Sequence, residues 1–385
     1  MQDHKKKLNI AIKALTVLLI AAVYMWVNIS VDSGHILGAA DEDSDEMTAV
    51  SIILSGKNAE GLENYDERLV KRTLINRGMT SDCIVLGSSR AAMIMDDYIE
   101  DGELLNLSVT GACLQDIIGI YGAYTERNGA PARVIISVDP WALNDNYLDS
   151  RFARSLGDSY YRYATEKLGR QDMDSSLTDV RPMYRTGEAG KLTDLNLKEM
   201  KELFSIPYFQ SNLQYAMSEK HAASVYATKN DFDVLGVLRS DGSYGYPSAY
   251  RNSDEYSILE RANSQIILAD GTRIIGFTEY TSCDGANKKL LADFLSEMQR
   301  SGVEVNILFT PISPIIWEFL QENLPDCAML QCESRIKEIC DELDITYYGS
   351  FDPAFFDYTF CDFYDGYHLR AENVGILVAE MEELR

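Results

Sequence analysis

Short, mostly apolar runs of residues recur in two parts of the chain, and stretches of helical periodicity separate them. The runs lie at residues 83–86, 104–109, 134–138, 303–309 and 345–348. A strand that is apolar throughout is typical of a parallel sheet buried on both faces, whereas a half-exposed strand alternates apolar and polar residues. The pattern therefore predicts an α/β fold whose parallel strands alternate with helices.

The predicted helices share an amphipathic pattern and mostly lie between these runs. Three of them cover residues 60–77, 284–300 and 332–343. Another begins at residue 91, a separate one follows residue 112 and ends near residue 127, and the last begins at residue 371. From about 144 to 280 the rhythm stops, and the chain becomes polar and rich in tyrosine. We interpret 144–280 as a large insertion. Its aromatic residues fit ordinary packing of an irregular subdomain, and a glycan-binding lid is the alternative.

The N-terminal region has the pattern of a membrane anchor. Four lysines precede an uncharged run at 14–31, which as a helix covers about 27 Å, close to the hydrocarbon thickness of a bilayer. Tyr24 and Trp26 lie toward its far end, where amphipathic aromatic residues favour the interface. The acidic stretch that begins at Asp41 follows. A cleaved signal peptide and a buried soluble helix remain alternatives.

The positive-inside rule then predicts the topology and the domains. Residues 1–13 form a cytoplasmic tail, and 14–31 form a single-pass anchor in the cell membrane. Residues 32–78 form an extracellular stalk and leading helix, and 79–385 form the extracellular α/β domain with its insertion.

Charge and composition exclude several classes of protein. The chain has 35 basic and 60 acidic residues and a net charge of −25, so its field repels nucleic acid. No Cys-x-x-Cys, His-x-x-x-His or nucleotide-binding glycine pattern occurs, so we expect no metal and no cofactor. Seven cysteines are too few for a disulfide scaffold, although Cys327 and Cys332 are close enough in sequence for a local disulfide.

Chemically useful residues follow the predicted strands. Ser89 follows the first strand, Gly111 the second and Asp139 the third, while Asp365 and His368 precede the last helix. Sites in parallel α/β sheets form at the carboxyl ends of strands, so these groups are expected at one rim. A hydroxyl, an imidazole, a carboxylate and backbone N–H donors are the parts of an acyl-transfer site. Singly, each residue also fits a helix cap, a turn or the surface.

Two other polar residues near this rim have weaker interpretations as substrate-binding groups. Arg90 is suited to a substrate carboxylate or phosphate, or to a salt bridge. Asp139 is suited to a substrate hydroxyl or a cation, or to a turn with Pro140. Beyond the predicted stalk the chain has only His221 and His368, and His221 lies in the insertion. His368 is therefore the expected base.

The ordered motifs Gly87-Ser88-Ser89, Gly111 and Asp365-x-x-His368 resemble those of the SGNH/GDSL hydrolases. The resemblance is closest to membrane-anchored cell-envelope members, including D-alanyl-lipoteichoic acid biosynthesis proteins and relatives linked to polysaccharide O-acetylation. It covers roughly residues 80–140 and 284–385. It implies a three-layer α/β/α sandwich with Ser89 as nucleophile, His368 as general base and Asp365 as its orienting acid. It also implies an oxyanion hole built from the backbone N–H groups of Ser89 and Gly111.

Two positions depart from the family pattern. Ser88 replaces the usual Asp, and the third block reads Ser137-Val138-Asp139-Pro140 where a Gly-x-Asn-Asp would supply an oxyanion-hole asparagine. Asn144 follows at the wrong spacing. Loss of one oxyanion donor costs roughly 10²–10³ in rate.

Two functions follow from these observations. The first is an extracytoplasmic serine esterase or acyltransferase that acts on cell-envelope glycan or teichoic acid, with a membrane O-acyltransferase as a partner by analogy. The second is a non-catalytic, membrane-anchored accessory protein that binds an envelope polymer or such an acyltransferase.

Overall fold

The computed structural model describes residues 2–31, 44–62, 65–99, 103–147, 155–170, 203–217, 225–266, 277 and 280–384. Its central sheet consists of β2 (Cys83–Gly87), β3 (Leu104–Asn106), β4 (Arg133–Val138), β8 (Glu304–Phe309) and β9 (Thr346–Gly349). All neighbouring strands are parallel, in the order β3-β2-β4-β8-β9. The five strands predicted from the apolar runs are thus confirmed, with shifts of one to three residues at their ends.

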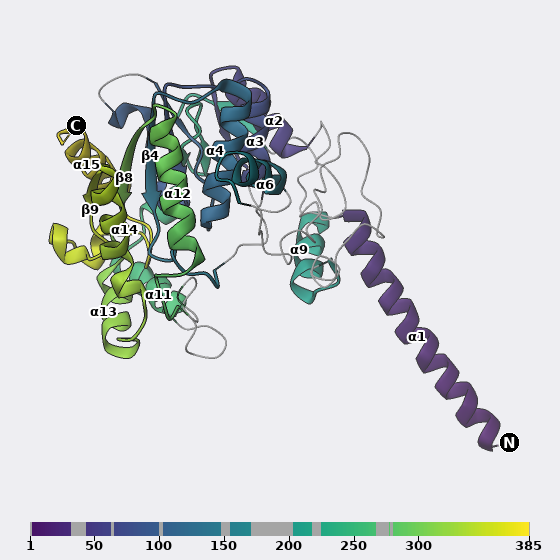
Figure 1. The fold of residues 1–385 in the computed structure, drawn as a ribbon. Helices are drawn as coiled ribbons and strands as arrows, with labels where there is room; N and C mark the ends of the chain where they lie inside the picture. Colours follow the sequence, from purple (N-terminus) through teal and green to yellow (C-terminus); the bar gives the residue numbers. More distant parts are fainter. Residues whose placement is uncertain are drawn as a thin grey trace.

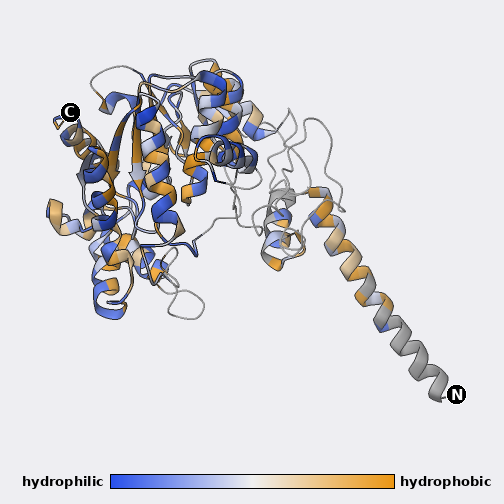
Figure 2. Cartoon of the chain, viewed as in Figure 1, coloured by the Kyte–Doolittle hydropathy of each residue, from blue (hydrophilic) through white to orange (hydrophobic). Residues whose placement is uncertain are grey.

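Helices cover both faces of this sheet (Figure 1). On one face lie α4 (Leu114–Asn128), α6 (Gly157–Glu166), α12 (Ala286–Arg300) and α14 (Met329–Leu343), and on the other lies α15 (Ala371–Glu382). Side chains of β2 alternate between the two cores: Ile84 and Leu86 join the first, and Cys83 and Val85 the second. Figure 2 shows that the surrounding helices have one hydrophobic and one hydrophilic side. The predicted α/β architecture with a doubly covered parallel sheet is confirmed.

Three-residue or four-residue 3₁₀ turns replace or supplement the predicted helices. They are η1 (Ser89–Ala91), η2 (Asp96–Tyr98), η4 (Pro353–Phe356) and η5 (Phe360–Asp362). The helix predicted to begin at residue 91 is therefore wrong. Asn106 stabilises the irregular segment that replaces it, since its amide donates to the carbonyls of Ala91 at 2.8 Å and Ile94 at 2.9 Å.

A second, antiparallel sheet was not predicted. It contains β5 (Tyr226–Thr228), β1 (Asn58–Glu60), β6 (Val237–Leu238) and β7 (Tyr244–Gly245), in that order. β1 comes from the predicted stalk and leading helix, while its partners come from the predicted insertion. Two regions far apart in the sequence are thereby joined beside the main sheet.

The described part of the predicted stalk is folded. It contains α2 (Asp45–Leu54), and α3 (Glu67–Asn76) lies within the predicted 60–77 helix. Met47, Val50 and Ile53 are buried against α3 and the small sheet, because their spacing places them on one face of α2. The prediction of a polar stalk is therefore wrong for this segment.

The insertion also contributes to the main body. Its described elements include α6, α9 (Ile206–Met217), α10 (Ser248–Arg251) and α11 (Glu255–Ile266). α6 packs closely on α4, where a Cβ on Gly122 would lie 2.9 Å from the Cβ of Tyr163. The helix α13 (Pro314–Asn323) was not predicted either. His221 lies outside the described residues.

The N-terminal helix α1 (Gln2–Val31) extends away from the body, with α9 beside its C-terminal end (Figure 1). The Asn28 amide donates to the Leu203 carbonyl at 2.6 Å, and the ring of Tyr24 stacks on that of Phe209 with centroids 4.6 Å apart. Among the residues that the structure describes, no helix combines the length and apolar character that a membrane span requires.

Candidate active site

Ser89 lies immediately beyond the carboxyl end of β2. The next strand in sequence, β3, pairs with one edge of β2, and the strand after it, β4, pairs with the other edge, so Ser89 lies at the topological switch point of the sheet. Two residues earlier, the backbone of Gly87 lies so close to β4 that a Cβ on residue 87 would lie 2.7 Å from the Ser137 carbonyl oxygen. Ser88 caps η1, because its Oγ accepts from the Arg90 amide at 3.2 Å. The adjacent serine is thus the cap, and the Ser89 hydroxyl contacts a different partner.

The structure brings Ser89, His368 and Asp365 together in one hydrogen-bonded series. Ser89 Oγ lies 2.8 Å from His368 Nε2, and His368 Nδ1 lies 2.9 Å from Asp365 Oδ2. The backbone amides of Tyr367 and His368 donate to Asp365 Oδ1 at 2.8 and 2.9 Å. This turn folds the carboxylate back onto one ring nitrogen, so the other nitrogen faces the serine. The arrangement can remove a proton from Ser89 and orient the imidazole that receives it.

Two side chains from the insertion complete the environment of Asp365. The Tyr250 hydroxyl donates to Asp365 Oδ2 at 2.6 Å, and the Gln265 amide donates to the same oxygen at 2.8 Å. Burial favours a higher pKa for Asp365, but His368, Tyr250 and the Tyr367 amide together hold the pKa below its ordinary value. Asp365 therefore stays ionised at neutral pH. Burial, followed by the Asp365 charge, raises the pKa of Tyr250, which stays a donor.

The insertion also contacts the nucleophile and the base directly. The hydroxyl of Tyr246 donates to the carbonyl of Ser89 at 3.4 Å. Its ring meets that of His368 edge to face, with centroids 5.6 Å apart. Sequence reasoning missed Tyr246, Tyr250 and Gln265 as site residues. The only signal was the general tyrosine content of the insertion.

Arg90 and Asp139, which we expected as weak substrate-binding groups, are buried together behind η1. Their side chains are 1% and 3% exposed, and Arg90 Nη1 lies 3.4 Å from Asp139 Oδ1. Ser88 Oγ donates to that oxygen at 2.9 Å, and Arg90 Nη2 donates to the Pro311 carbonyl at 2.8 Å. Their observed contacts are thus with protein groups that hold the nucleophile turn, and neither side chain lines the cavity described below. Burial raises the pKa of Asp139 to about 6 despite the nearby Arg90.

The expected oxyanion donors are the backbone N–H groups of Ser89 and Gly111. Gly111 has φ +62°, a conformation that suits glycine, and its carbonyl accepts from the Tyr147 hydroxyl at 3.1 Å. Within the described residues, no hydrogen bond takes up either N–H. Asn144 is buried; its side-chain Oδ1 accepts from the Asn146 amide at 3.0 Å, and its carbonyl accepts from Asn287 at 3.0 Å.

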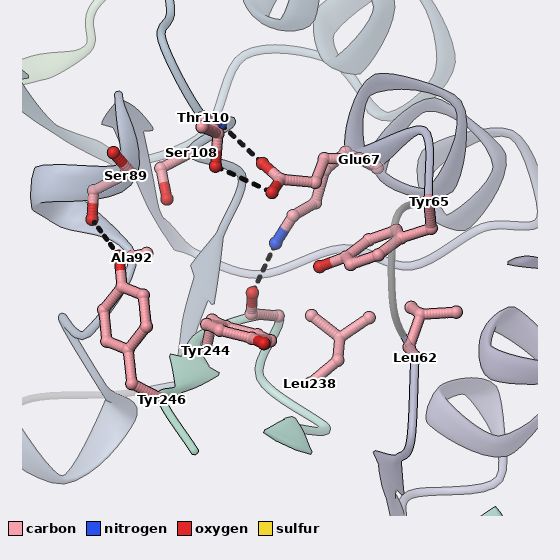
Figure 3. Close-up of a pocket in the computed structure, with 12 residues that line it drawn as sticks. Leu62, Tyr65, Glu67, Ser89, Ala92, Ser108, Thr110, Leu238, Tyr244 and Tyr246 are labelled. Carbon is pink, nitrogen blue, oxygen red and sulfur yellow. Dashed lines mark hydrogen bonds between the residues drawn. The ribbon is translucent and has the colours of Figure 1, made fainter. Parts of the chain in front are cut away.

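A cavity of about 450 Å³ opens beside Ser89. Its lining residues come from η1 and its C-cap, the segment around α3, the loop after β3, and the small sheet with its flanking turns: Leu62, Tyr65, Glu67, Lys71, Ser89, Ala92, Ser108, Thr110, Leu238, Gly242, Tyr244 and Tyr246. Figure 3 labels most of these side chains around the cavity. Glu67 is held by Thr110, whose hydroxyl donates to it at 2.7 Å. Lys71 is buried and donates to the Asn106 carbonyl at 2.8 Å, and burial lowers its pKa to about 8. The cavity therefore combines tyrosine rings, hydroxyls and two opposite charges.

The cysteines and possible metal ligands do not add to this site. Cys113 is the buried N-cap residue of α4, and its thiol donates to Asp116 Oδ2 at 3.3 Å. Cys361 is partly exposed, and neither residue forms a disulfide. In the part of the chain that the structure describes, no three His, Cys, Asp or Glu side chains form a group suited to a metal ion.

Comparisons with known proteins do not extend this description. The chain matches no known family in a scan of family profiles, and no curated protein matches its sequence. The resemblance to SGNH/GDSL hydrolases therefore rests on the motifs themselves.

Proposed function

We propose that this protein is a serine ester hydrolase or acyltransferase of the SGNH type. The observation that carries the proposal is the continuous series from Ser89 Oγ through His368 to Asp365, with links of 2.8 and 2.9 Å. Such distances match those of an activated serine nucleophile with its base and orienting acid.

The proposed reaction has two steps. Ser89 Oγ bonds to the carbonyl carbon of an ester while His368 Nε2 takes the hydroxyl proton. The tetrahedral intermediate then expels the alcohol, which receives that proton, and leaves an acyl-serine. In the second step, water or an acceptor hydroxyl attacks the acyl-serine, gives its proton to His368 and releases an acid or a new ester. Asp365 holds the imidazole and stabilises its protonated form without accepting the proton.

The cavity beside Ser89 supports a large alcohol or acceptor part in the substrate. At about 450 Å³ it lies within the range of sites for small organic molecules, and a short acyl group leaves most of it empty. Tyrosine rings pack on sugar faces, while Glu67 and Ser108 supply hydrogen-bonding groups for hydroxyls. We therefore propose a sugar or polyol of a cell-envelope glycan or teichoic acid as the alcohol part.

This aspect is tested with two substrates. Tyr65→Ala is expected to lower kcat/KM for an O-acetylated oligosaccharide by roughly tenfold and to leave turnover of p-nitrophenyl acetate within about twofold, because only the larger alcohol reaches Tyr65. Tyr256→Ala, at a residue 73% exposed, is the matched control. Equal loss on both substrates, or on neither, contradicts the assignment.

The proposal also includes the compartment. It is supported by the sequence, in which four lysines precede the uncharged residues 14–31 and acidic residues follow. Anchored in this way, the body lies outside the cell near envelope polymers and a membrane O-acyltransferase. A reporter fused after residue 50 is expected to be active only outside the membrane. Activity in the cytoplasm refutes the compartment and both partners.

A specific observation favours the accessory-protein alternative. The third block places Asp139 at the position where an oxyanion asparagine is expected, and Asp139 is buried against Arg90. A fold of this type without that donor is suited to binding a polymer or a membrane acyltransferase without turnover.

Ester hydrolysis by the purified full chain separates the two functions. We expect turnover of p-nitrophenyl acetate that Ser89→Ala abolishes. Ser334→Ala, at an exposed position of α14, is expected to retain it. A folded protein without turnover favours the accessory role, and unchanged turnover in Ser89→Ala refutes the proposed nucleophile.

A further inference from the structure

Three cysteines gather where the segment before α12 meets the start of α14. Cys283 and Cys332 are 3% and 0% exposed, and Cys327 is partly buried. The Ala328 amide donates to the Tyr280 carbonyl at 2.9 Å, which ties the two segments together. All seven cysteines lie in the described part of the chain, and none of them is in a disulfide.

The contacts of Cys283 point toward Cys332. Cys283 Sγ donates to the Ala328 carbonyl at 3.0 Å and lies 3.3 Å from the Tyr280 hydroxyl. The Ala328 carbonyl also accepts from the Gln331 amide at 2.9 Å, so Cys283 Sγ lies against the first turn of α14, the turn that contains Cys332. Cys283 and Cys332 belong to the same hydrophobic cluster.

The electrostatics agree with this geometry. A side-chain hydrogen bond with Cys332 is the main cause that lowers the pKa of Cys283 to about 7. Burial, followed by the hydrogen bond with Cys283, raises the pKa of Cys332. One thiol is thus prepared to act as the thiolate, and its neighbour stays protonated, an asymmetry that favours attack by Cys283.

We propose that Cys283 and Cys332 form a reversible disulfide that clips the segment before α12 to α14. The oxidant is a small-molecule disulfide such as oxidised glutathione. Because both thiols are buried, the exchange takes place when the segment before α12 opens locally: the Cys283 thiolate then attacks the disulfide and releases one glutathione thiol. Cys332 then loses its proton and displaces the second glutathione, which forms the Cys283–Cys332 bond. Two protein thiols are oxidised, and one glutathione disulfide is reduced to two thiols.

Cys327, the partner suggested for Cys332 by sequence proximity, faces a different group. Its Sγ lies 4.0 Å from the Phe277 carbonyl, and burial raises its pKa. The pairing that we propose joins residues about 50 positions apart, so it restricts the unfolded chain more than a five-residue loop does.

The experiment treats the full chain with oxidised glutathione under native conditions and maps the thiols without reduction. Trypsin leaves Cys327 and Cys332 on one peptide, so chymotrypsin, which cleaves after Leu330, is added to separate them. We expect two fewer of the seven thiols, a linked peptide pair with Cys283 and Cys332, and a Tm higher by roughly 5 °C that a reductant reverses.

Variants distinguish this pair from its neighbour. Cys332→Ala is expected to abolish the linked pair and the Tm rise, whereas Cys327→Ala retains both. If Cys332→Ala does not fold, the linked peptides of the unmodified chain and of Cys327→Ala decide. A pair that contains Cys327, a glutathione adduct without a linked pair, or no reaction overturns the proposal. The outcome does not depend on esterase activity.

Discussion

The rim of the parallel sheet and the tyrosine segment of the insertion contribute to the same site in different ways. The rim supplies Ser89 and His368, whose atoms are placed to exchange a proton. The insertion supplies Tyr246, whose hydroxyl donates to the Ser89 carbonyl, and Tyr250, whose hydroxyl donates to the Asp365 carboxylate. The first region carries the proposed chemistry, and the second holds the geometry that the chemistry needs.

This difference also appears in burial and charge. Asp365 is surrounded by donors from both regions, and they keep its pKa low although the residue is buried. Without Tyr250 and Gln265, one carboxylate oxygen would have only His368 as its donor. The comparison teaches that an insertion without sheet periodicity can still be part of the site. It predicts that substitutions of rim residues reduce kcat strongly and that substitutions in the insertion reduce it moderately.

The largest effect is expected for His368→Ala. Loss of the base removes the proton acceptor of Ser89, so kcat for p-nitrophenyl acetate is expected to fall by roughly 10⁶. The double variant Ser89→Ala with His368→Ala is expected to be no slower than either single variant, since the two residues act as a unit. Steady-state rates measure this. Additive losses would mean that His368 acts independently of Ser89.

A smaller loss is expected for Asp365→Asn. The amide keeps the shape of the side chain but removes the charge that orients His368, so kcat is expected to fall by roughly 10⁴. Circular dichroism serves as the control for folding. A loss as large as that of His368→Ala would show that Asp365 does more than orient the base.

The insertion is tested by Tyr250→Phe, which removes one donor to Asp365 and keeps the ring. One hydrogen bond of about 1 kcal/mol predicts a loss of roughly five- to tenfold in kcat with little change in KM. In the Asp365→Asn background the same substitution is expected to have almost no further effect, because the hydroxyl acts through the carboxylate. Tyr256→Phe is the exposed control. A tenfold further loss in that background would disconnect Tyr250 from Asp365.

The last prediction concerns the buried pair behind the nucleophile and is measured as stability against pH, not as activity. Burial raises the pKa of Asp139 to about 6 from an ordinary value near 4, so its ionisation costs stability as pH rises between these values. Asp139→Asn has no such ionisation. Its stability relative to the unmodified chain is therefore expected to rise by roughly 1–3 kcal/mol from pH 4 to pH 7.

Denaturant unfolding at several pH values checks this slope. The pKa near 6 already includes the attraction of Arg90, so loss of the ion pair is part of this slope and not a separate contribution. A difference that stays constant with pH would show that the pKa of Asp139 is not raised in the folded protein, and a difference that falls would show that it is lowered.

The main sheet was predictable because each of its strands lies in a short, mostly apolar run, and the order of motifs along the chain follows the strand ends. The small sheet was not, because Asn58–Glu60 is short and polar and pairs with residues near 227 and 238. Helix α13 was missed because Pro314 lies shortly after β8 and resembles a turn signal, whereas here it occupies the first helical position, which tolerates proline.

The same reasoning applies within the site. Spacing predicted that a turn would carry Asp365 back to His368, because three residues suffice for it. No local pattern indicates that Tyr250, more than 100 positions earlier, donates to that carboxylate. Burial of Arg90 was also invisible, since charged residues are seldom buried and its partner lies on another strand end.

The most direct test of the central claim is covalent labelling by a fluorophosphonate, which reacts with an activated serine. The account predicts a single adduct on the peptide 78–90 of the full chain, with fragment ions that assign it to Ser89 and exclude Ser88. It also predicts loss of the adduct in Ser89→Ala and in His368→Ala. An adduct on Ser88 or another residue, or no adduct on the folded protein, would contradict the claim that Ser89, His368 and Asp365 form a working catalytic series.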